Sequence, residues 1–303
     1  MVSEKYDLVV IGAGPAGLSA GIYAARYKLN VIVIGKEMGG LAATAHRICN
    51  YPSYNNVKGF ELMQKFIQHA EELGVKIVYK EVTKIDKKNK EFVIQADKEY
   101  RSKKIVFAGG TIQKKLGLKN EGKFVGKGVS YCATCDAAFF KNKIVTIVGG
   151  SDSALTAALL LSEFATKVYI IYRKDKFFRG DPSWVDLVEK EKKIIPIFNE
   201  EIMEIMGNEK VEGVKLKSGK ELKLEGVFIE IGSVPEIKFI SKLNIKITDS
   251  GYIITDKNQK TNIPGFFAAG DITDSELKQI VTAASQGAIA SYNVYQEIKK
   301  EAN

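Results

Sequence analysis

The chain has 303 residues, of which 45% are hydrophobic, 27% are charged and 27 are glycine. This composition is typical of a folded α/β protein and excludes the disordered and fibrous classes. The sequence contains no run of 18 or more apolar residues and no signal-peptide pattern before the first strand-like stretch, so we expect a cytoplasmic protein without a membrane partner.

The formal net charge is +9 and the isoelectric point is about 9.1. A basic balance of this size can indicate a polyanionic partner. The lysines, however, are spread along the chain in short groups such as Lys87 with Lys88, which is typical of a solvated surface. We therefore expect no nucleic-acid partner and keep an acidic protein partner as the alternative.

The first elements predict a βαβ unit. Residues 7–11 read as a buried strand, residues 12–17 as a glycine turn, the alanine-rich stretch to about residue 27 as a helix, and residues 31–34 as a second strand. A chain of this length can bury two modest cores, so the unit indicates the first of two domains.

The turn of this unit contains the pattern GxGxxG, formed by Gly12, Gly14 and Gly17. After a strand and before a helix, these glycines allow a tight turn, backbone approach to a pyrophosphate and close packing of helix on strand. A plain βα turn is the alternative. The acid that usually binds the ribose at the end of the second strand comes late here, as Glu37.

The middle of the chain carries a CxxC motif, Cys132 and Cys135, and the only other cysteine is Cys49. A structural zinc site needs four ligands, and Cys49 with the two histidines offers no second pair, so we expect a redox dithiol and no metal. A thiolate at a helix N-terminus is stabilised and nucleophilic. Asp136 either moves a proton to or from a thiolate or caps a helix.

A second βαβ unit follows the CxxC motif. Residues 144–148 form its first strand, residues 149–154 its glycine turn, a helix runs through residue 161, and residues 167–172 form its second strand. The chain therefore contains two nucleotide-type domains.

Near the C-terminus, an apolar stretch at residues 266–269 ends in Gly270 and Asp271, and a helix follows. An aspartate there can accept a hydrogen bond from a ribityl hydroxyl, and the helix N-terminus can face a flavin; a strand-to-helix turn capped by Asp271 is the alternative. A flavin site built from both ends of the chain makes the middle an insertion. We expect a first flavin part at residues 1–113, an inserted nucleotide domain with the CxxC at 114–243, and a second flavin part at 244–303.

These segments together resemble the low-molecular-weight thioredoxin reductases. The resemblance rests on GAGPAG at residues 12–17, YCATCD at residues 131–136 and FAAGD at residues 267–271, and it covers nearly the whole chain. It implies an α/β fold with two Rossmann-like domains of the three-layer ββα type, the second inserted into the first. It also implies that Cys135 lies nearest the flavin, that Cys132 attacks the protein disulfide and that Asp136 donates the proton.

The resemblance further implies an FAD site made from both flavin parts. Its expected residues are Gly12, Ala13, Gly14, Pro15, Ala16, Gly17, Glu37, Gly39, Gly40, Leu41, Asn50, Val82, Ala108, Gly109, Gly270, Asp271, Lys278, Gln279 and Ile280. Two positions depart from the family pattern: Gly109-Gly110 stands where Thr-Gly is usual, and Lys278 replaces an arginine and lacks its planar fork.

The inserted domain of the family binds NADPH. The matching positions here are Gly149, Gly150, Ser151, Asp152, Ala154, Arg173, Lys174 and Arg179. Ser151 replaces a glycine, which puts close approach of a pyrophosphate in doubt, and Arg179 comes one residue late. A solvated basic turn is the alternative, and the electron donor is then NADH, a reduced deazaflavin or ferredoxin.

The predicted function is thioredoxin-disulfide reductase, with electrons passing from NADPH through FAD and the Cys132/Cys135 pair to thioredoxin or a similar small dithiol protein. The resemblance also implies a homodimer. We expect hinges at residues 109–117 and 232–235, where glycine and proline allow the chain to change direction. The rival interpretation is a flavin and dithiol redox sensor without turnover.

Overall fold

The computed structural model describes residues 4–302, which fall into two units. Unit 1 comprises residues 4–43, 48–112 and 234–302, and unit 2 comprises residues 44–47 and 113–233. Apart from the short segment 44–47, unit 2 is one insertion in the sequence of unit 1. Both units have the mixed α/β architecture that the two βαβ patterns predict.

Unit 1 is built on a sheet with the order β3-β2-β1-β6-β5-β4. The parallel strands are β1 (Glu4–Ile11), β2 (Val31–Gly35), β3 (Lys76–Tyr79), β6 (Glu99–Phe107) and β17 (Phe266–Ala268). The antiparallel strands β4 (Lys84–Lys88) and β5 (Glu91–Gln95) lie beside the first half of β6, while β17 pairs with its second half. The carboxyl ends of β1, β2, β6 and β17 therefore share one edge, where such sheets bind nucleotides.

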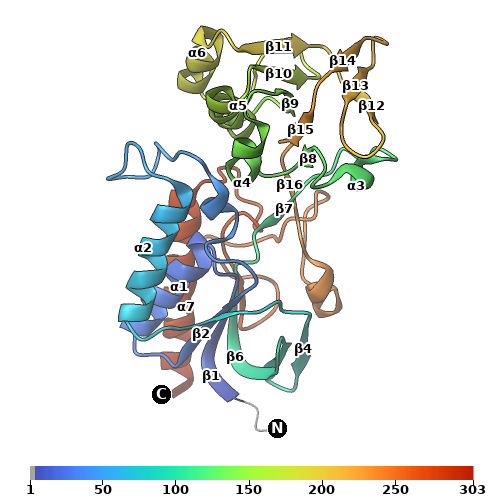
Figure 1. Cartoon of the computed structure of the whole chain (residues 1–303). Helices are drawn as coiled ribbons and strands as arrows, with labels where there is room; N and C mark the ends of the chain where they lie inside the picture. Colours follow the sequence, from blue (N-terminus) through green and yellow to red (C-terminus); the bar gives the residue numbers. More distant parts are fainter. Residues whose placement is uncertain (1–3, 303) are drawn as a thin grey trace. The chain divides into compact units, whose positions relative to one another are not determined.

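Three helices of unit 1 gather along one face of this sheet: α1 (Pro15–Arg26), α2 (Gly59–Glu72) and α7 (Ile280–Ala302) (Figure 1). Successive residues of a strand point to opposite faces. Accordingly, Leu8 and Val10 pack toward these helices, while Val9 and Ile11 pack into a second core with the 3-10 helix η3 (Lys238–Leu243). A shorter 3-10 helix, η1, spans Gly40–Thr44.

Unit 2 is built on a parallel sheet with the order β11-β10-β9-β15-β8. Its strands are β8 (Val129–Ser130), β9 (Ile144–Val148), β10 (Lys167–Tyr172), β11 (Ile194–Phe198) and β15 (Gly226–Ile229). The helices are α3 (Glu121–Phe124), α4 (Ala133–Asp136), α5 (Asp152–Phe164) and α6 (Pro182–Lys190), with the 3-10 helix η2 (Ala137–Phe140).

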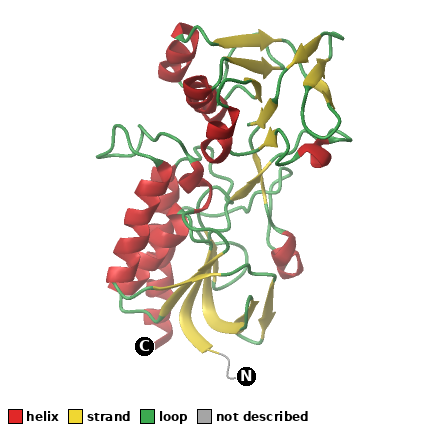
Figure 2. Cartoon of the chain, viewed as in Figure 1, coloured by secondary structure: helices red, strands yellow, loops and turns green. Residues whose placement is uncertain are grey.

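A second, antiparallel sheet gives unit 2 its third layer. It consists of β12 (Ile202–Met206), β13 (Gly213–Leu216) and β14 (Glu221–Lys223). Phe228 of β15 packs toward α5, whereas its neighbours Val227 and Ile229 pack toward this small sheet. Figure 2 shows helices in red along one side of the larger sheet and the small sheet in yellow on its other side. The predicted ββα layering is thus present in unit 2.

Two short strands, β7 (Thr111–Gln113) and β16 (Ser233–Pro235), pair where the chain leaves and re-enters unit 1. The first crossing lies within one residue of the expected boundary at 113/114. The second lies at residues 233/234, and the expected boundary at 243/244 is wrong by ten residues. The reason is that Ile240 and Leu243 of η3 are buried in the core of unit 1 beside β4. Among residues 4–302, no helix is both long and apolar enough to cross a membrane.

Candidate redox and nucleotide sites

Cys132 and Cys135 form a disulfide in unit 2, with their Cα atoms 5.3 Å apart. Cys132 is the N-cap of the one-turn helix α4, and its Sγ atom accepts a hydrogen bond from the backbone N–H of Cys135 at 3.2 Å. The Cys132 N–H in turn donates to the Ser130 hydroxyl at 3.0 Å. An N–H directed at a sulfur stabilises negative charge on it, so the geometry favours Cys132 as the thiolate once the disulfide is reduced.

The segment in front of the disulfide is held by a buried carboxylate. Glu121, on α3, is 3% exposed and accepts hydrogen bonds from the backbone N–H groups of residues 116, 117 and 118. It also accepts a hydrogen bond from the hydroxyl of Tyr131, the residue before Cys132. Burial and this bond both raise the pKa of Tyr131, so the phenol stays neutral and holds its place. The sequence does not single out Glu121, because the backbone N–H groups that bind its carboxylate are brought together only by the folded loop.

Asp136 ends α4, and its backbone N–H donates to the carbonyl oxygen of Cys132 at 3.2 Å. Its carboxylate makes no capping hydrogen bond to the 3-10 helix η2 that follows. The capping alternative for this side chain is therefore wrong. The partly buried carboxylate, next in sequence to Cys135, remains available for proton transfer.

The glycine turn of unit 1 is tightly packed. A Cβ atom on Gly12, whose φ is +111°, would overlap the carbonyl oxygen of Ala108, and one on Gly17 would overlap the carbonyl oxygen of Gly12. Gly14 is different, since a Cβ there would come no closer than 3.8 Å to its nearest neighbour, the Gly39 carbonyl oxygen. Gly12 and Gly17 thus serve backbone packing, while a Cβ on Gly14, at the N-terminus of α1, would make only an ordinary van der Waals contact.

Residues from the far end of the chain close around this turn. Gly270 approaches Ala16 so closely that a Cβ on it would lie 2.9 Å from the Ala16 Cβ. On α7, a Cβ on Gly287 would overlap the Ala16 carbonyl oxygen, and the Ser291 hydroxyl donates to the Ala20 carbonyl oxygen at 2.7 Å. Sequence reasoning missed these α7 contacts. The signal was the spacing of the small residues Ala283, Gly287 and Ser291 at every fourth position, which places them on one helix face.

Gln286 of the same helix accepts a hydrogen bond from the Gly270 N–H at 2.7 Å. Beside it, the carboxyl group of Asp271 has no hydrogen-bond partner among the described residues, and burial raises its pKa against the opposing effect of Lys278. The Lys278 amine donates to the carbonyl oxygens of Asp271 (3.0 Å) and Thr273 (2.8 Å). It lies 3.9 Å from the ring centre of Tyr252. Burial lowers the pKa of Lys278.

Other expected FAD residues lie at or near this edge in different ways. Asn50 donates to the Gln279 side chain at 3.1 Å, which joins two positions 229 residues apart, and Ile280 begins α7. A Cβ on Gly40 would lie 3.4 Å from the Gly14 Cα atom. Val82 is buried in the core, so only its backbone is free for a ligand. Leu41 is 39% exposed.

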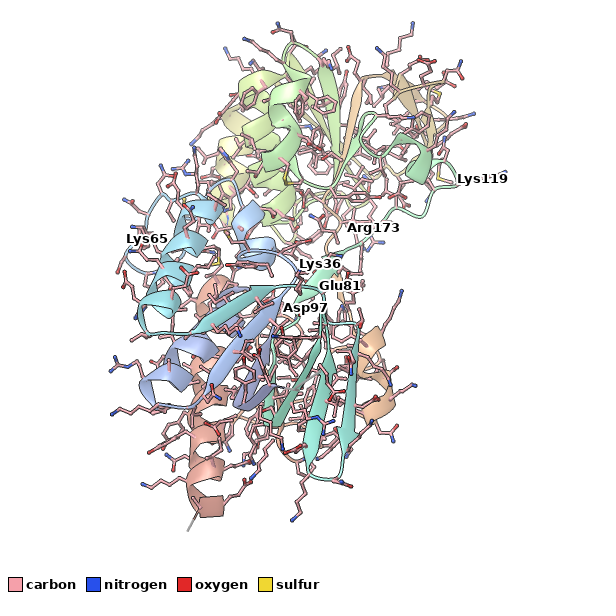
Figure 3. All side chains as sticks on the ribbon, turned by 60° about the horizontal axis from the view of Figure 1, so that its bottom comes forward. Lys36, Lys65, Glu81, Asp97, Lys119 and Arg173 are labelled. Atoms are coloured by element: carbon pink, nitrogen blue, oxygen red, sulfur yellow. A yellow bond between two sulfur atoms is a disulfide. The ribbon has the colours of Figure 1, made fainter. Side chains whose placement is uncertain are left out.

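Two charged residues, Lys36 and Glu37, directly follow β2. Glu37 is exposed in the bend after this strand. Its neighbour Lys36 reaches Glu81, from the loop after β3, with 3.4 Å between the Nζ and Oε1 atoms (Figure 3). Both side chains are more than 60% exposed, so this ion pair contributes little to stability.

The residues of unit 1 fit a flavin dinucleotide. The first turn of α1 has no side-chain cap and no acidic residue, so its backbone N–H groups are free to receive a pyrophosphate. Gly14 leaves room for that approach, and within residues 4–302 the carboxyl group of Asp271 has no hydrogen-bond partner. The site thus combines an anion-binding turn with an acceptor suited to a sugar hydroxyl.

The matching turn of unit 2 follows β9. Gly149 has φ of +146°, and a Cβ on it would overlap the carbonyl oxygen of Glu230. A Cβ on Gly150 would meet the ring of Tyr172, which stacks on Phe177 with 6.0 Å between ring centres. Ser151 is the N-cap of α5 but makes no capping bond with its side chain. Ala154 is fully buried under the turn.

The expected basic residues of unit 2 are exposed and come from two segments of the chain. Arg173 and Lys174 come directly after β10, where a ribose phosphate would lie; Arg173 is labelled in Figure 3. Arg179 forms a backbone bridge with Ser151, so its backbone lies beside the turn itself. The Asp181 N–H next to it donates to Asp152 at 2.6 Å. Among the described residues, no group of three or more His, Cys, Asp or Glu side chains is arranged to hold a metal.

Residues 6–287 match the model of the pyridine nucleotide-disulphide oxidoreductase family. A thioredoxin reductase of Listeria monocytogenes is 39% identical over 99% of this chain and 97% of its own length. The crystal structure of Lactococcus lactis thioredoxin reductase superposes with a TM-score of 0.94 at 38% identity, covering 97% of this chain and 99% of that one. The crystal structure of T. acidophilum thioredoxin reductase superposes with a TM-score of 0.93 at 37% identity, covering 98% of this chain and 99% of that one.

Proposed function

This chain belongs to the pyridine nucleotide-disulphide oxidoreductase family, and from that premise we propose that it works as a low-molecular-weight thioredoxin reductase. It is an FAD-dependent oxidoreductase that takes electrons from NADPH and reduces a protein disulfide. The observation that carries the proposal is the disulfide between Cys132 and Cys135, at the N-terminus of α4 within a nucleotide-type unit.

The proposed thiol chemistry uses both sulfurs in turn. Two electrons and two protons open the Cys132–Cys135 bond, and the Cys132 thiolate then attacks the disulfide of thioredoxin to form a mixed disulfide. Cys135 attacks the Sγ atom of Cys132, which releases the thioredoxin dithiol and closes the ring again. The hydrogen bond from the Cys135 N–H to Cys132 supports this division of roles. Asp136 supplies and recovers the proton exchanged with the cysteine sulfurs.

Bound FAD supplies the two-electron carrier between a nicotinamide and the disulfide. Unit 1 is the proposed FAD-binding domain. Its first glycine turn would hold the pyrophosphate, and Asp271 would accept a hydrogen bond from the ribityl chain. The amine of Lys278 is already bound to two carbonyl oxygens, so it contributes positive charge rather than a bidentate contact.

Unit 2 is the proposed NADPH domain, with the turn at Gly149 for the pyrophosphate and Arg173 and Lys174 for the 2′-phosphate. Thioredoxin as the partner, homodimeric assembly and a cytoplasmic location complete the proposal. The family resemblance supports the first two, and a redox CxxC without a disulfide framework supports the third. Hinge movement at the paired strands β7 and β16 also belongs to the proposal.

An anaerobic titration tests which nucleotide donates the electrons. The FAD-loaded protein is mixed with increasing NADPH or NADH while the visible absorbance of the flavin is followed. We expect NADPH to bleach the flavin at near-stoichiometric amounts and NADH to require a large excess. An oxidised spectrum that persists with both would contradict NADPH as the donor.

A further inference from the structure

The carboxylate of Glu121 in unit 2 is fully occupied by hydrogen bonds. Its Oε1 atom accepts from the Leu116 N–H at 3.1 Å and from the Tyr131 hydroxyl, and its Oε2 atom accepts from the Gly117 N–H at 2.7 Å and the Leu118 N–H at 3.3 Å. An ionised carboxylate offers about four acceptor positions, so these donors fill it. Glu121 therefore has no acceptor position left for a ligand, and any role it has is exerted through the groups that it holds.

Glu121 is itself anchored in the core of unit 2. It lies on α3, whose Phe124 is 1% exposed and packs in the hydrophobic core shared by β8, β12 and β13. The amide of Asn120, one residue before it, donates to the carbonyl oxygen of Ile205 on β12. The carboxylate is thus a fixed point, and the Tyr131 hydroxyl is the donor that ties the redox segment to it.

The backbone of Cys132 is held on both sides by its neighbours. Its N–H donates to the Ser130 hydroxyl at 3.0 Å, and the same hydroxyl donates to its carbonyl oxygen at 3.3 Å. Ser130 is 4% exposed, and Tyr131, between the two, is bound to Glu121. These bonds fix the extended conformation of Cys132, with φ of −140° and ψ of 95°, in which its sulfur meets the Cys135 N–H.

Opening the disulfide removes the covalent bond that holds the two sulfurs together. Helix α4 has only four residues, Ala133–Asp136, and a helix of one turn is not stable by itself because its nucleation is unfavourable. In the reduced protein, the hydrogen bond from the Cys135 N–H to the Cys132 sulfur therefore depends on the bonds that hold the preceding segment. The phenol of Tyr131 stays a donor wherever a thiol titrates, because burial and the bond to Glu121 raise its pKa.

We propose that Glu121, acting through Tyr131, is a positioning residue that keeps the reduced Cys132 thiolate against the Cys135 N–H for its attack on a protein disulfide. The inference rests on the proposed function, because it takes Cys132 as the attacking thiol. It assigns a task in thiol exchange to a buried acid outside the CxxC motif. In the alternative role Glu121 only closes the loop at residues 116–118, and removing the phenol hydroxyl alone then leaves the thiol unchanged.

Tyr131→Phe separates these two roles, because it keeps the aromatic ring and the backbone bonds of the Glu121 carboxylate and removes only the hydroxyl. The FAD-loaded protein is reduced anaerobically, excess reductant is removed, and the alkylation rate of Cys132 by iodoacetamide is measured from pH 5 to pH 9 by peptide mass spectrometry. We expect the midpoint of the pH–rate profile to move to higher pH and the rate at pH 7 to fall about fivefold, as for the loss of one hydrogen bond. Cys49 is the internal reference.

Tyr169→Phe is the matched control. Tyr169, on β10, is partly buried and packs against the same hydrophobic core as Tyr131. Its variant also loses one phenol hydroxyl, and it should leave the pH–rate profile of Cys132 unchanged. An unchanged or faster alkylation of Cys132 in Tyr131→Phe would overturn the inference, as would the same slowing in Tyr169→Phe.

A double-mutant cycle tests whether Glu121 acts through Tyr131. Glu121→Gln places an amide group against backbone N–H donors, so it should slow the alkylation of Cys132 at least as much as Tyr131→Phe does. Adding Tyr131→Phe to Glu121→Gln should then cause no further slowing, whereas two effects that multiply would contradict the proposed path. If Glu121→Gln does not fold, the comparison of Tyr131→Phe with Tyr169→Phe decides by itself.

Reduction of thioredoxin by the same reduced protein reports on the proposed function separately. If the parent reduces thioredoxin while Tyr131→Phe leaves the alkylation of Cys132 unchanged, the proposed function stands and the role of Glu121 is wrong. If Tyr131→Phe slows the alkylation as expected but the parent does not reduce thioredoxin, the positioning of Cys132 stands and the proposed function is wrong.

Discussion

The Sγ atom of Cys132 accepts a hydrogen bond from the backbone N–H of Cys135, at 3.2 Å. The two cysteines are therefore not equivalent, although they share one disulfide. Cys132 sits at the N-cap of α4, where the N–H group stabilises a thiolate, whereas Cys135 lies within the helix and is more exposed to solvent.

This difference predicts the order in which the reduced cysteines react. We expect iodoacetamide at pH 7 to modify Cys132 several-fold faster than Cys135, because the thiolate is the reacting form. Peptide mass spectrometry after short exposures measures both rates, with Cys49, the remaining free cysteine, as an internal reference. If Cys135 reacted first, solvent exposure would outweigh the N-cap geometry, and Cys135 would be the better candidate for the attacking thiol.

The glycines of the first turn should separate folding from cofactor binding. Gly17→Ala forces a Cβ into the Gly12 carbonyl oxygen, so we expect a loss of roughly 1–3 kcal/mol in the free energy of unfolding, with or without FAD. The Cβ of Gly14→Ala makes only an ordinary van der Waals contact, 3.8 Å from the Gly39 carbonyl oxygen, so the FAD-free protein should keep its stability while FAD affinity falls at least tenfold.

Urea unfolding and flavin fluorescence measure these two properties. Gly122→Ala is the control, since a Cβ there has no neighbour within 4 Å and the residue lies outside the turn. Equal FAD affinity in Gly14→Ala and the parent would remove Gly14 from the proposed pyrophosphate site.

The ionised carboxyl group of Asp271 should destabilise the folded protein as long as no cofactor is bound to it. Its folded-state pKa is raised by burial, so its ionised form destabilises the fold above that pKa, and the cost disappears as the pH falls below the unfolded-state value. We expect Asp271→Asn to stabilise the FAD-free protein at pH 7 by roughly 1 kcal/mol and to lose this advantage toward pH 4. The same variant should bind FAD about tenfold more weakly, because a charge-assisted hydrogen bond is lost. Denaturation curves at both pH values and a flavin titration check the two effects, and a variant less stable at pH 7 would contradict the reasoning.

Lys104 anchors the C-terminal helix to the sheet. Its side chain is 6% exposed, and its amine lies 2.8 Å from Glu297 and 2.6 Å from Glu301 of α7. Lys104→Ala leaves the half-exposed Glu301 without this partner, while Glu297 keeps Lys260, so we expect a loss of roughly 1–2 kcal/mol in the free energy of unfolding of the FAD-loaded protein. Lys103→Ala, an exposed neighbour on the same strand, should change it by less than about 0.5 kcal/mol. Similar values for the two variants would show that the pair with α7 contributes little.

The parts of the fold that the sequence predicts are those fixed by local patterns. The turns at Gly12 and Gly149 are readable because a strand, a glycine turn and a helix follow each other directly. The position of the second crossing cannot be read from the sequence, because nothing local shows that Ile240 and Leu243 are buried in unit 1. That assignment depends on contacts with β4, about 150 residues earlier.

The candidate sites follow the same rule. The CxxC pair and Asp271 stand out in the sequence because their chemistry is carried by residue type. Glu121 does not stand out, since an acid in a lysine-rich chain is most often a surface residue. Its role comes from the backbone N–H groups around its carboxylate, which only the folded chain brings together.

The most direct test of the central proposal follows electrons from the flavin to thioredoxin without any dinucleotide. The FAD-loaded protein is reduced anaerobically with dithionite until both flavin and disulfide are reduced, and it is then mixed with oxidised thioredoxin in a stopped-flow instrument. We predict that flavin absorbance returns in the parent and in the control Cys49→Ser, and that it stays low in Cys135→Ser, which cannot form the Cys132–Cys135 bond. Flavin reoxidation by thioredoxin at the parent rate in Cys135→Ser, or none in the parent, would contradict the proposal.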